Sequence, residues 1–189
     1  MISLEYPFTE KAVRALKAGD AVSITGRIYT GRDKFHKYFA DGGRIDVDFR
    51  DGALYHCGPV CVRGADGAWR VVAAGPTTSV RENPYEPAFI AQSGVRIIIG
   101  KGGMDAATLA AMKRHGCVYV QAVGGAAAIS AAAVRKVAGV SHLDEFGAAE
   151  ACWHFDVVDF RGVVAMDAHG VSLFDRVAKA SAARLAELL

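Results

Sequence analysis

The sequence lacks several features that would assign it to a class at once. No apolar run approaches the roughly 20 residues that a membrane-spanning helix requires. The start, MISLEYPFTEK, has no basic segment ahead of an apolar stretch, so we do not expect a secretory signal. Charge of one sign is also missing, because 22 basic and 20 acidic residues leave a net charge of +2. That balance argues against a surface devoted to nucleic acid.

Metal-binding motifs are absent as well. The four cysteines form no CxxC pair, and they are Cys57, Cys61, Cys117 and Cys152. Without a secretory signal, we expect reduced thiols in a cytoplasmic protein. The six histidines form no HxH or HExxH pair. We therefore predict that this chain holds no metal site of its own.

What the chain does have is apolar residues in short, regular segments. Its 189 residues are 52% hydrophobic and 22% charged, which is enough to bury the core of one domain spanning residues 1–189. Hydrophobic spacing and capping signals predict helices at residues 9–18, 32–40, 84–93, 105–115, 126–133 and 172–189. Strands are expected at residues 20–29, 45–50, 53–57, 69–74, 95–99, 117–122, 155–158 and 162–166. Strand and helix alternate in the second half, so we expect an α/β fold with buried parallel strands.

Two loops combine polar side chains with a strand-to-helix position, where α/β proteins place ligands. Residues 75–81 (GPTTSVR) carry three consecutive hydroxyl groups followed by Arg81, which can hold a carboxylate or phosphate through two hydrogen bonds. Residues 99–105 (IGKGGMD) place Lys101 beside glycines, whose backbone N–H groups can approach an anion at a helix start. The loops follow neighbouring strand-like segments, and a shared pocket is expected. The plainer interpretation is a capped helix with a solvated arginine, and a glycine turn with a solvated lysine.

A third strand end carries Arg32, in the segment YTGRD. It is a candidate for another anion ligand. The alternative is a surface arginine paired with Asp33, and such exposed pairs contribute about 0–1 kcal/mol.

These segments together resemble a known enzyme family. The stretches GRIYTGRDKFHK, AGPTTSVRENPY and VRIIIGKGGM look like the β subunit of class I, iron–sulfur-dependent fumarate hydratases, whose family includes the L-tartrate dehydratase β subunit. The later segments GCVYVQAVGGAAA and WHFDVVDFRGVVAMDAHG resemble that family in order and spacing. The resemblance implies a swivelling three-layer β/β/α domain. It also implies a hydro-lyase of the tricarboxylic acid cycle whose [4Fe–4S] cluster is carried by a partner α subunit.

The resemblance also implies roles for individual residues. Thr77 matches the position of the base that takes the C3 proton of malate, and Lys101 matches a supporting position. Arg32, Arg81 and Lys101, with Thr78 beside them, match substrate-binding positions. Three cations suit the two carboxylates of a C4 dicarboxylate such as fumarate or malate. A threonine hydroxyl is a poor base at its ordinary pKa, so it would need neighbouring groups to stabilise the alkoxide or relay the proton.

Three other interpretations stay open. The substrate can be tartrate or a methylated fumarate, because nothing in these loops selects one. The IGKGG loop also resembles the loop with which KH domains clamp RNA, although that loop joins two helices and this one follows a β-branched run. A catalytically silent, partner-binding subunit is the third, and the retained Arg32, Thr77, Arg81 and Lys101 argue against it.

Overall fold

The computed structural model describes residues 1–188, and its strands dominate the architecture. The strands are β1 (Ile2–Glu5), β2 (Ala21–Thr30), β3 (Ala53–Tyr55), β4 (Val60–Arg63), β5 (Trp69–Ala73), β6 (Ile97–Gly100), β7 (Val118–Gln121), β8 (Val134–Ser141) and β9 (Cys152–Met166). The helices are α1 (Glu10–Arg14), α2 (Asp33–Ala40), α3 (Glu86–Ser93), α4 (Ala106–His115), α5 (Ala127–Ala133), α6 (Leu143–Phe146) and α7 (Leu173–Leu188), with a 3-10 turn, η1, at Ser79–Glu82. The predicted α/β class is confirmed.

The main sheet closes on itself. Seven strands lie in the order β1-β2-β3-β6-β7-β9-β8, and an additional pairing joins β2 to β9. The ring β2-β3-β6-β7-β9 is therefore a small barrel, with β1 and β8 added outside it. Strands β3, β6 and β7 run parallel to one another, as the alternation of strand and helix predicted. The long β9 runs antiparallel to β2, β7 and β8.

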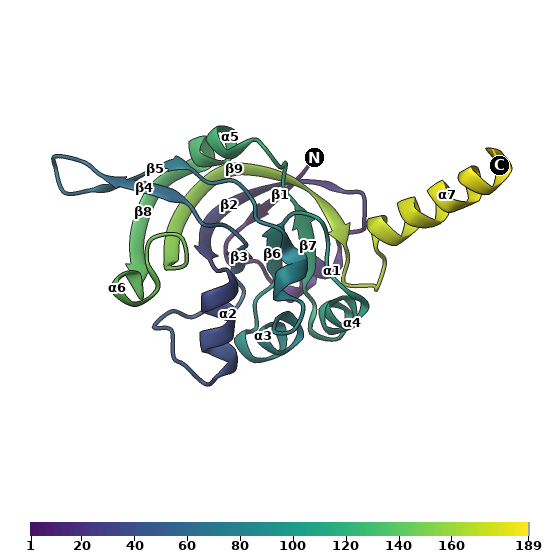
Figure 1. The fold of residues 1–189 in the computed structure, drawn as a ribbon, viewed down its shortest axis with the longest axis horizontal. Helices are drawn as coiled ribbons and strands as arrows, with labels where there is room; N and C mark the ends of the chain where they lie inside the picture. Colours follow the sequence, from purple (N-terminus) through teal and green to yellow (C-terminus); the bar gives the residue numbers. More distant parts are fainter. Residues whose placement is uncertain (189) are drawn as a thin grey trace.

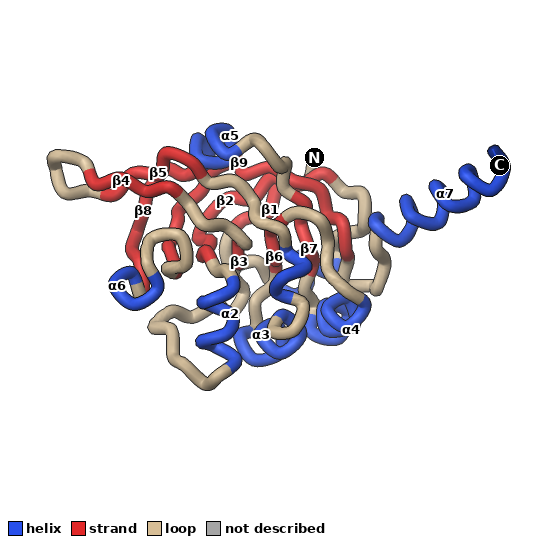
Figure 2. The backbone as a smooth tube through the Cα atoms, viewed as in Figure 1, coloured by secondary structure: helices blue, strands red, loops and turns tan. Residues whose placement is uncertain are grey.

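Helices cover this barrel on two opposite sides. In Figure 1, α2, α3 and α4 lie along one side, while α5 and the β4–β5 hairpin lie on the other. Figure 2 shows the strands gathered between these two groups. Helix α7 projects away from the barrel and buries no residue. Within residues 1–188, no helix is both long enough and apolar enough to cross a membrane.

Alternate residues of the parallel strands build two cores. Ile97 and Ile99 of β6 belong to one buried cluster, with Trp153 and Phe155 of β9, inside the ring of strands. Ile98 belongs to a second buried cluster with residues of α2, α3 and α4. Since successive strand residues point to opposite faces, a strand buried on both sides reads as an unbroken apolar run. This explains why IIIG is buried at every position.

Several sequence expectations about elements are wrong. Residues 45–50 form an irregular loop rather than a strand, although Ile45 and Phe49 are buried in the second cluster. The strands expected at 155–158 and 162–166 are one strand, β9. The helix expected at 9–18 ends at Arg14, with Thr9 as its N-cap as predicted. Strands β1, β4 and β8 were missed; β1 and β4 are largely exposed and β8 is at most half-buried, so they lack the apolar pattern of a buried strand.

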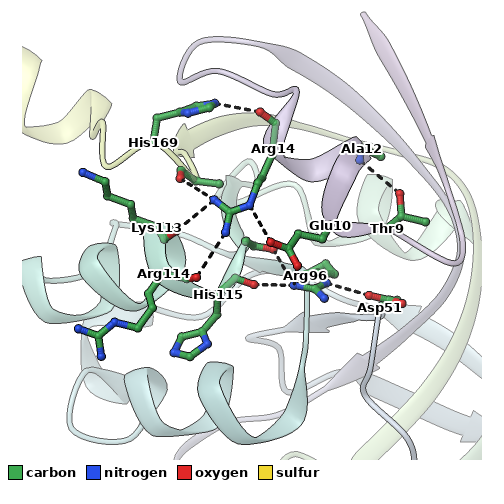
Figure 3. A network of polar contacts seen from close by, with 12 residues as sticks. Thr9, Glu10, Ala12, Arg14, Asp51, Arg96, Lys113, Arg114, His115 and His169 are labelled. Carbon is green, nitrogen blue, oxygen red and sulfur yellow. Dashed lines mark hydrogen bonds and ion pairs between the residues drawn. The ribbon is translucent and has the colours of Figure 1, made fainter.

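Two arginines fasten the end of α4 to the rest of the fold, as Figure 3 shows. The Arg14 guanidinium donates to the carbonyls of Lys113 and Arg114, at 3.1 and 3.3 Å. Arg96 donates to the carbonyl of His115 and to the Asp51 carboxylate. The last carbonyls of a helix have no partner within the helix, so these cations satisfy them and offset the negative end of its dipole. Helix α4 follows the Lys101 loop, and the contacts hold it in place.

Candidate active site

The two loops singled out from the sequence lie side by side. Thr78 and Lys101 form a parallel β-bridge just beyond the ends of the barrel strands. The Lys101 amide donates to the Thr77 carbonyl at 3.3 Å, and the Ser79 amide donates to the Lys101 carbonyl at 3.0 Å. The predicted proximity of the loops is therefore confirmed.

Thr77 presents a hydroxyl that has no protein partner. Its amide donates to the His56 carbonyl at 2.7 Å, which fixes the backbone at the end of β3. Its Oγ1 atom is buried and makes no hydrogen bond within the described chain. A buried hydroxyl without a partner costs roughly 1–3 kcal/mol. Such an atom is suited to a ligand or to a proton in transit.

Lys101 is held by Thr78, the residue that follows Thr77. Its ammonium donates to the Thr78 Oγ1 at 3.0 Å. Gly102 and Gly103 follow with φ angles of 86° and 78°, a left-handed backbone that favours glycine. A Cβ on Gly103 would come within 2.6 Å of the Phe174 ring, so the packing also requires glycine. The two glycines thus turn the chain between Lys101 and helix α4, whose N-cap is Asp105.

Both arginines lie at the start of α2, Arg32 by its place in the sequence and Arg81 through an ion pair. Arg32 is the residue before α2, and its Nε lies 3.4 Å from a Glu150 carboxylate oxygen. Arg81 belongs to η1, and its guanidinium forms an ion pair with Asp33, the first residue of α2. The sequence alternative had paired Asp33 with Arg32, whereas the structure pairs it with Arg81. Between residues 1 and 188, no hydrogen bond joins the Arg32 side chain to Thr77, Thr78 or Lys101.

The site is open to solvent in this chain. The Arg81 side chain is 56% exposed, while that of Arg32 is 21% exposed. The predicted site residues thus form two groups, the paired loops with Thr77, Thr78 and Lys101 and the arginines at the start of α2, and within residues 1–188 no hydrogen bond or ion pair joins the side chains of one group to those of the other. Positive charge and hydroxyl donors with no cover suit an anionic ligand that a second surface encloses.

Sequence reasoning missed a buried polar cluster behind the loops. His36, His56 and Glu86 are fully buried, and their ligand-type atoms all lie within 4.8 Å of one another. Such a set has the chemistry to hold a metal ion. The spacings of 20 and 30 residues gave no motif to find, and only the packing of α2 and α3 beside the end of β3 brings the three together.

The cysteines do not assemble into a cluster site. Cys57, Cys117 and Cys152 are buried, and burial raises the pKa of each thiol. Burial also raises the pKa of Cys61, to about 12. Protonated thiols are poor metal ligands. In the part of the chain that the structure describes, the one group with metal-ligand proximity contains no cysteine. The residues present therefore do not fit an iron–sulfur cluster held by this chain.

The setting of the glycine loop bears on the RNA interpretation. The loop joins strand β6 to helix α4, whereas the RNA-clamping loop joins two helices. The fold and the site therefore define an α/β domain that offers cations and hydroxyl groups to an anion at the ends of parallel strands.

Comparison with known proteins gives the family. Residues 1–177 match the family model described as Fumarase C-terminus, and the chain belongs to this family. It is 49% identical over 187 residues to a putative fumarate hydratase class I of Geobacillus stearothermophilus. That match covers 99% of this chain but 36% of the relative, so the chain spans about a third of its length.

Two other relatives are named as separate subunits. The chain is 39% identical over 194 residues to a putative L(+)-tartrate dehydratase subunit beta of Methanocaldococcus jannaschii, covering 98% of this chain and 99% of the relative. It is 33% identical over 172 residues to the L(+)-tartrate dehydratase subunit beta of Escherichia coli K12, covering 90% and 85%. The family resemblance seen in the sequence is confirmed.

Proposed function

We propose that this chain is the β component of an iron–sulfur hydro-lyase that adds water reversibly to fumarate to form (S)-malate. The observation that carries the proposal is the buried, unpartnered Thr77 hydroxyl on a loop whose next residue, Thr78, holds the Lys101 ammonium, in a chain 49% identical to a putative fumarate hydratase class I. Arg32 and Arg81 are proposed to bind the two carboxylates of the substrate by charge-assisted hydrogen bonds. The [4Fe–4S] cluster is assigned to a partner α subunit, as the cysteines of this chain do not fit it.

Each site residue has a distinct proposed task. In the dehydration direction Thr77 accepts the C3 proton of malate, either as an alkoxide or by relaying it onward. Lys101, on the loop that pairs with the Thr77–Thr78 segment, is proposed to supply the positive charge that favours the alkoxide form and the charge that develops on the substrate carboxylate. For the guanidinium of Arg81 to bind substrate, it must exchange Asp33 for a substrate carboxylate.

The second candidate is the β subunit of an L-tartrate dehydratase, acting on tartrate to give oxaloacetate. The full-length match to a relative named as such a subunit favours it. Tartrate carries one more hydroxyl than malate, and the same cations would bind its carboxylates. The fumarate hydratase proposal includes four further points. It treats residues 1–189 as a single domain that swivels against the partner, and it places the enzyme in the tricarboxylic acid cycle and in the cytoplasm.

The test is an anaerobic pull-down with this chain as bait from its native extract. We expect a brown partner with the absorbance of a [4Fe–4S] cluster, and hydration of fumarate by the complex. Faster turnover of tartrate than of fumarate and malate would select the second candidate. A colourless eluate from an extract with intact hydratase activity would contradict both.

A further inference from the structure

A chain of buried polar groups runs directly behind the candidate site. The Glu86 carboxylate oxygen Oε2 lies 3.1 Å from the Nε2 of His36 and 3.1 Å from the Nε2 of His56. The other ring nitrogen of His56 lies 2.9 Å from the Ser79 hydroxyl, which lies 2.9 Å from the Tyr119 hydroxyl. His36, His56, Glu86 and Ser79 are each at most 1% exposed.

The same residues hold the backbone of the site. The His56 carbonyl accepts the amide of Thr77, and the Ser79 amide donates to the carbonyl of Lys101. The Arg32 carbonyl accepts from both the amide and the ring Nδ1 of His36, each at 2.9 Å. Every one of these links joins a network member to a residue proposed to bind substrate or move a proton. The network is thus a common support for three loops from separate parts of the sequence.

Geometry assigns the protons in this network. Both nitrogens of His36 face acceptors: Nδ1 faces the Arg32 carbonyl and, at 3.3 Å, a Glu82 oxygen, while Nε2 faces Glu86. The contact between His36 Nε2 and Glu86 has the distance of an ion pair but not the alignment of a hydrogen bond, and the carboxylates of Glu86 and Glu82 beside the ring favour an imidazolium at His36. His56 Nε2 donates to the Glu86 carboxylate, and a neutral His56 would accept the Ser79 hydroxyl proton at Nδ1, where a hydroxyl can satisfy the lone pair.

The pKa directions agree with this assignment. Burial alone would lower the pKa of His36, but the Glu86 carboxylate raises it above its ordinary value. Burial lowers the pKa of His56. Although burial opposes it, the two imidazoles hold the pKa of Glu86 at about 2. Glu82 from η1, with Asp33 beside it, and Tyr119 from β7 are the other titratable groups against the network.

The packing leaves no room for another arrangement at the Ser79 end. A Cβ added at Gly100 would lie 2.0 Å from the Ser79 hydroxyl oxygen and 3.2 Å from the His56 Nδ1. Glycine at position 100 therefore leaves the space that the Ser79 hydroxyl and the His56 ring occupy next to the Lys101 loop. This accounts for a second glycine requirement in the GKGG segment beyond its turn.

We propose that His36, Glu86, His56 and Ser79 form one buried positioning network, joined by an ion contact between His36 and Glu86 and by hydrogen bonds from Glu86 through His56 to Ser79, that fixes the Thr77 and Lys101 loops for proton transfer. The proposal rests on the proposed function for the reaction that the loops serve. A misplacement of about 1 Å in such a site costs roughly 100-fold in rate. The network supports the backbone of Thr77 and Lys101 rather than the guanidinium of Arg81, so its loss should act on kcat more than on KM.

The first arm of the test needs no partner protein. In the full chain with 15N-labelled histidine, nitrogen NMR at pH 7 should show one ring protonated at both nitrogens, His36, and one neutral ring protonated at Nε2, His56. Glu86→Gln should convert His36 to a neutral ring, since an amide offers one acceptor and no charge. A neutral His36 in the unaltered chain would overturn the network. The network would also be overturned if the chain held one equivalent of tightly bound zinc that His36→Ala removes. A metal ion would then occupy the positions assigned to the protons between the histidines and Glu86.

The second arm measures hydration by the complex with the α subunit. Glu86→Gln should lower kcat about 10–100-fold and change KM less than about threefold, because the loops of Thr77 and Lys101 shift while the Arg81 guanidinium, which the network does not contact, stays. Ser79→Ala is expected to act the same way and serves if Glu86→Gln does not fold. Thr108→Val is the matched control, since Thr108 is equally buried, its hydroxyl has no partner, and it lies outside the network.

The outcomes separate the two proposals. Unchanged kcat in both folded variants would overturn the positioning role. An equal loss in Thr108→Val would also overturn it, because the effect would then follow from any buried substitution. An unaltered complex with no hydro-lyase activity would overturn the proposed function, while the NMR arm would still decide whether the network exists.

Discussion

At the scale of single residues, removal of the unpartnered Thr77 hydroxyl should affect catalysis but not the stability of the fold. Thr77→Val keeps the size of the side chain and removes a buried oxygen that has no hydrogen bond. We expect unchanged or slightly higher thermal stability, because the desolvation cost of that oxygen disappears. The complex should lose exchange of the malate C3 proton with solvent by at least about 100-fold. Deuterium exchange followed by NMR measures this, and retained exchange would move the base to another residue.

Arg81 allows a similar test of substrate binding. It is exposed, and its partner Asp33 competes for the guanidinium. Loss of a charge-assisted hydrogen bond costs about 1.5–3 kcal/mol, so Arg81→Ala should raise KM for fumarate about 10- to 100-fold. Arg70→Ala is the control, as Arg70 is an exposed arginine paired with Asp66 on the β4–β5 hairpin. Steady-state kinetics with equal KM in the two variants would remove Arg81 from the site.

Glu82 predicts how stability depends on pH. Burial raises the pKa of this carboxyl from 4.5 to about 7, despite the nearby His36. The folded state then binds the proton more tightly than the unfolded chain, so its contribution to stability is fully present below pH 4.5. That contribution is lost as the pH rises through 7. Glu82→Gln should flatten the fall in the free energy of unfolding between pH 5 and 8, measured by urea titration. An identical slope in both proteins would show that Glu82 ionises freely.

Local patterns at this scale predicted the loops but not their support. Hydroxyls and cations next to glycines, each following an apolar run, located Thr77, Thr78, Arg81 and Lys101, and the structure joins the two loops. The partners of these residues lie far away in sequence. Glu150 meets Arg32 only because β9 begins beside α2, and no spacing rule connects them.

At the scale of elements, the contacts of Arg14 and Arg96 with the end of α4 should contribute to the free energy of unfolding. Arg96 is 16% exposed and satisfies carbonyls that would otherwise be unpaired. Arg96→Ala should lower the free energy of unfolding by about 1–3 kcal/mol, since buried carbonyls lose a charged donor. Arg114→Ala is the control, because that side chain extends away from the network in Figure 3. Chemical denaturation measures both, and equal stabilities would show that water replaces the guanidinium without cost.

Strand β9 shows why element boundaries escaped the sequence. The polar segment around Asp159 reads as a turn, and Asp159 does have a positive φ of 55°. Tertiary contacts nevertheless carry the strand through it. The Ser23 hydroxyl donates to the Asp159 carboxylate at 2.7 Å, and the Asp159 amide donates to the Thr25 hydroxyl at 3.2 Å. Pairing with β2 on both sides of this point outweighs the local preference.

At the scale of the whole molecule, the same unit occurs in two settings. It covers 99% of a relative named as a separate β subunit, and 36% of a longer relative. The family could be recognised from the order of the motifs along the chain. The closure of the barrel through β2 and β9 could not, since those strands pair across more than 100 residues and carry no pairing signal. Under the proposed function, the face that carries the exposed Arg81 is the one that a partner covers.

An open half-site should be inactive alone and complete when covered. We expect the purified chain to be colourless and to hydrate neither fumarate nor tartrate, because Arg81 is exposed and the cysteines form no cluster site. Adding the α subunit under anaerobic conditions should restore hydration in a saturable titration. The Arg81→Ala chain should saturate at the same ratio with lower activity, since it loses substrate contacts rather than the partner. A brown, active preparation of this chain by itself would contradict the division of labour, because the cluster would then lie on this half.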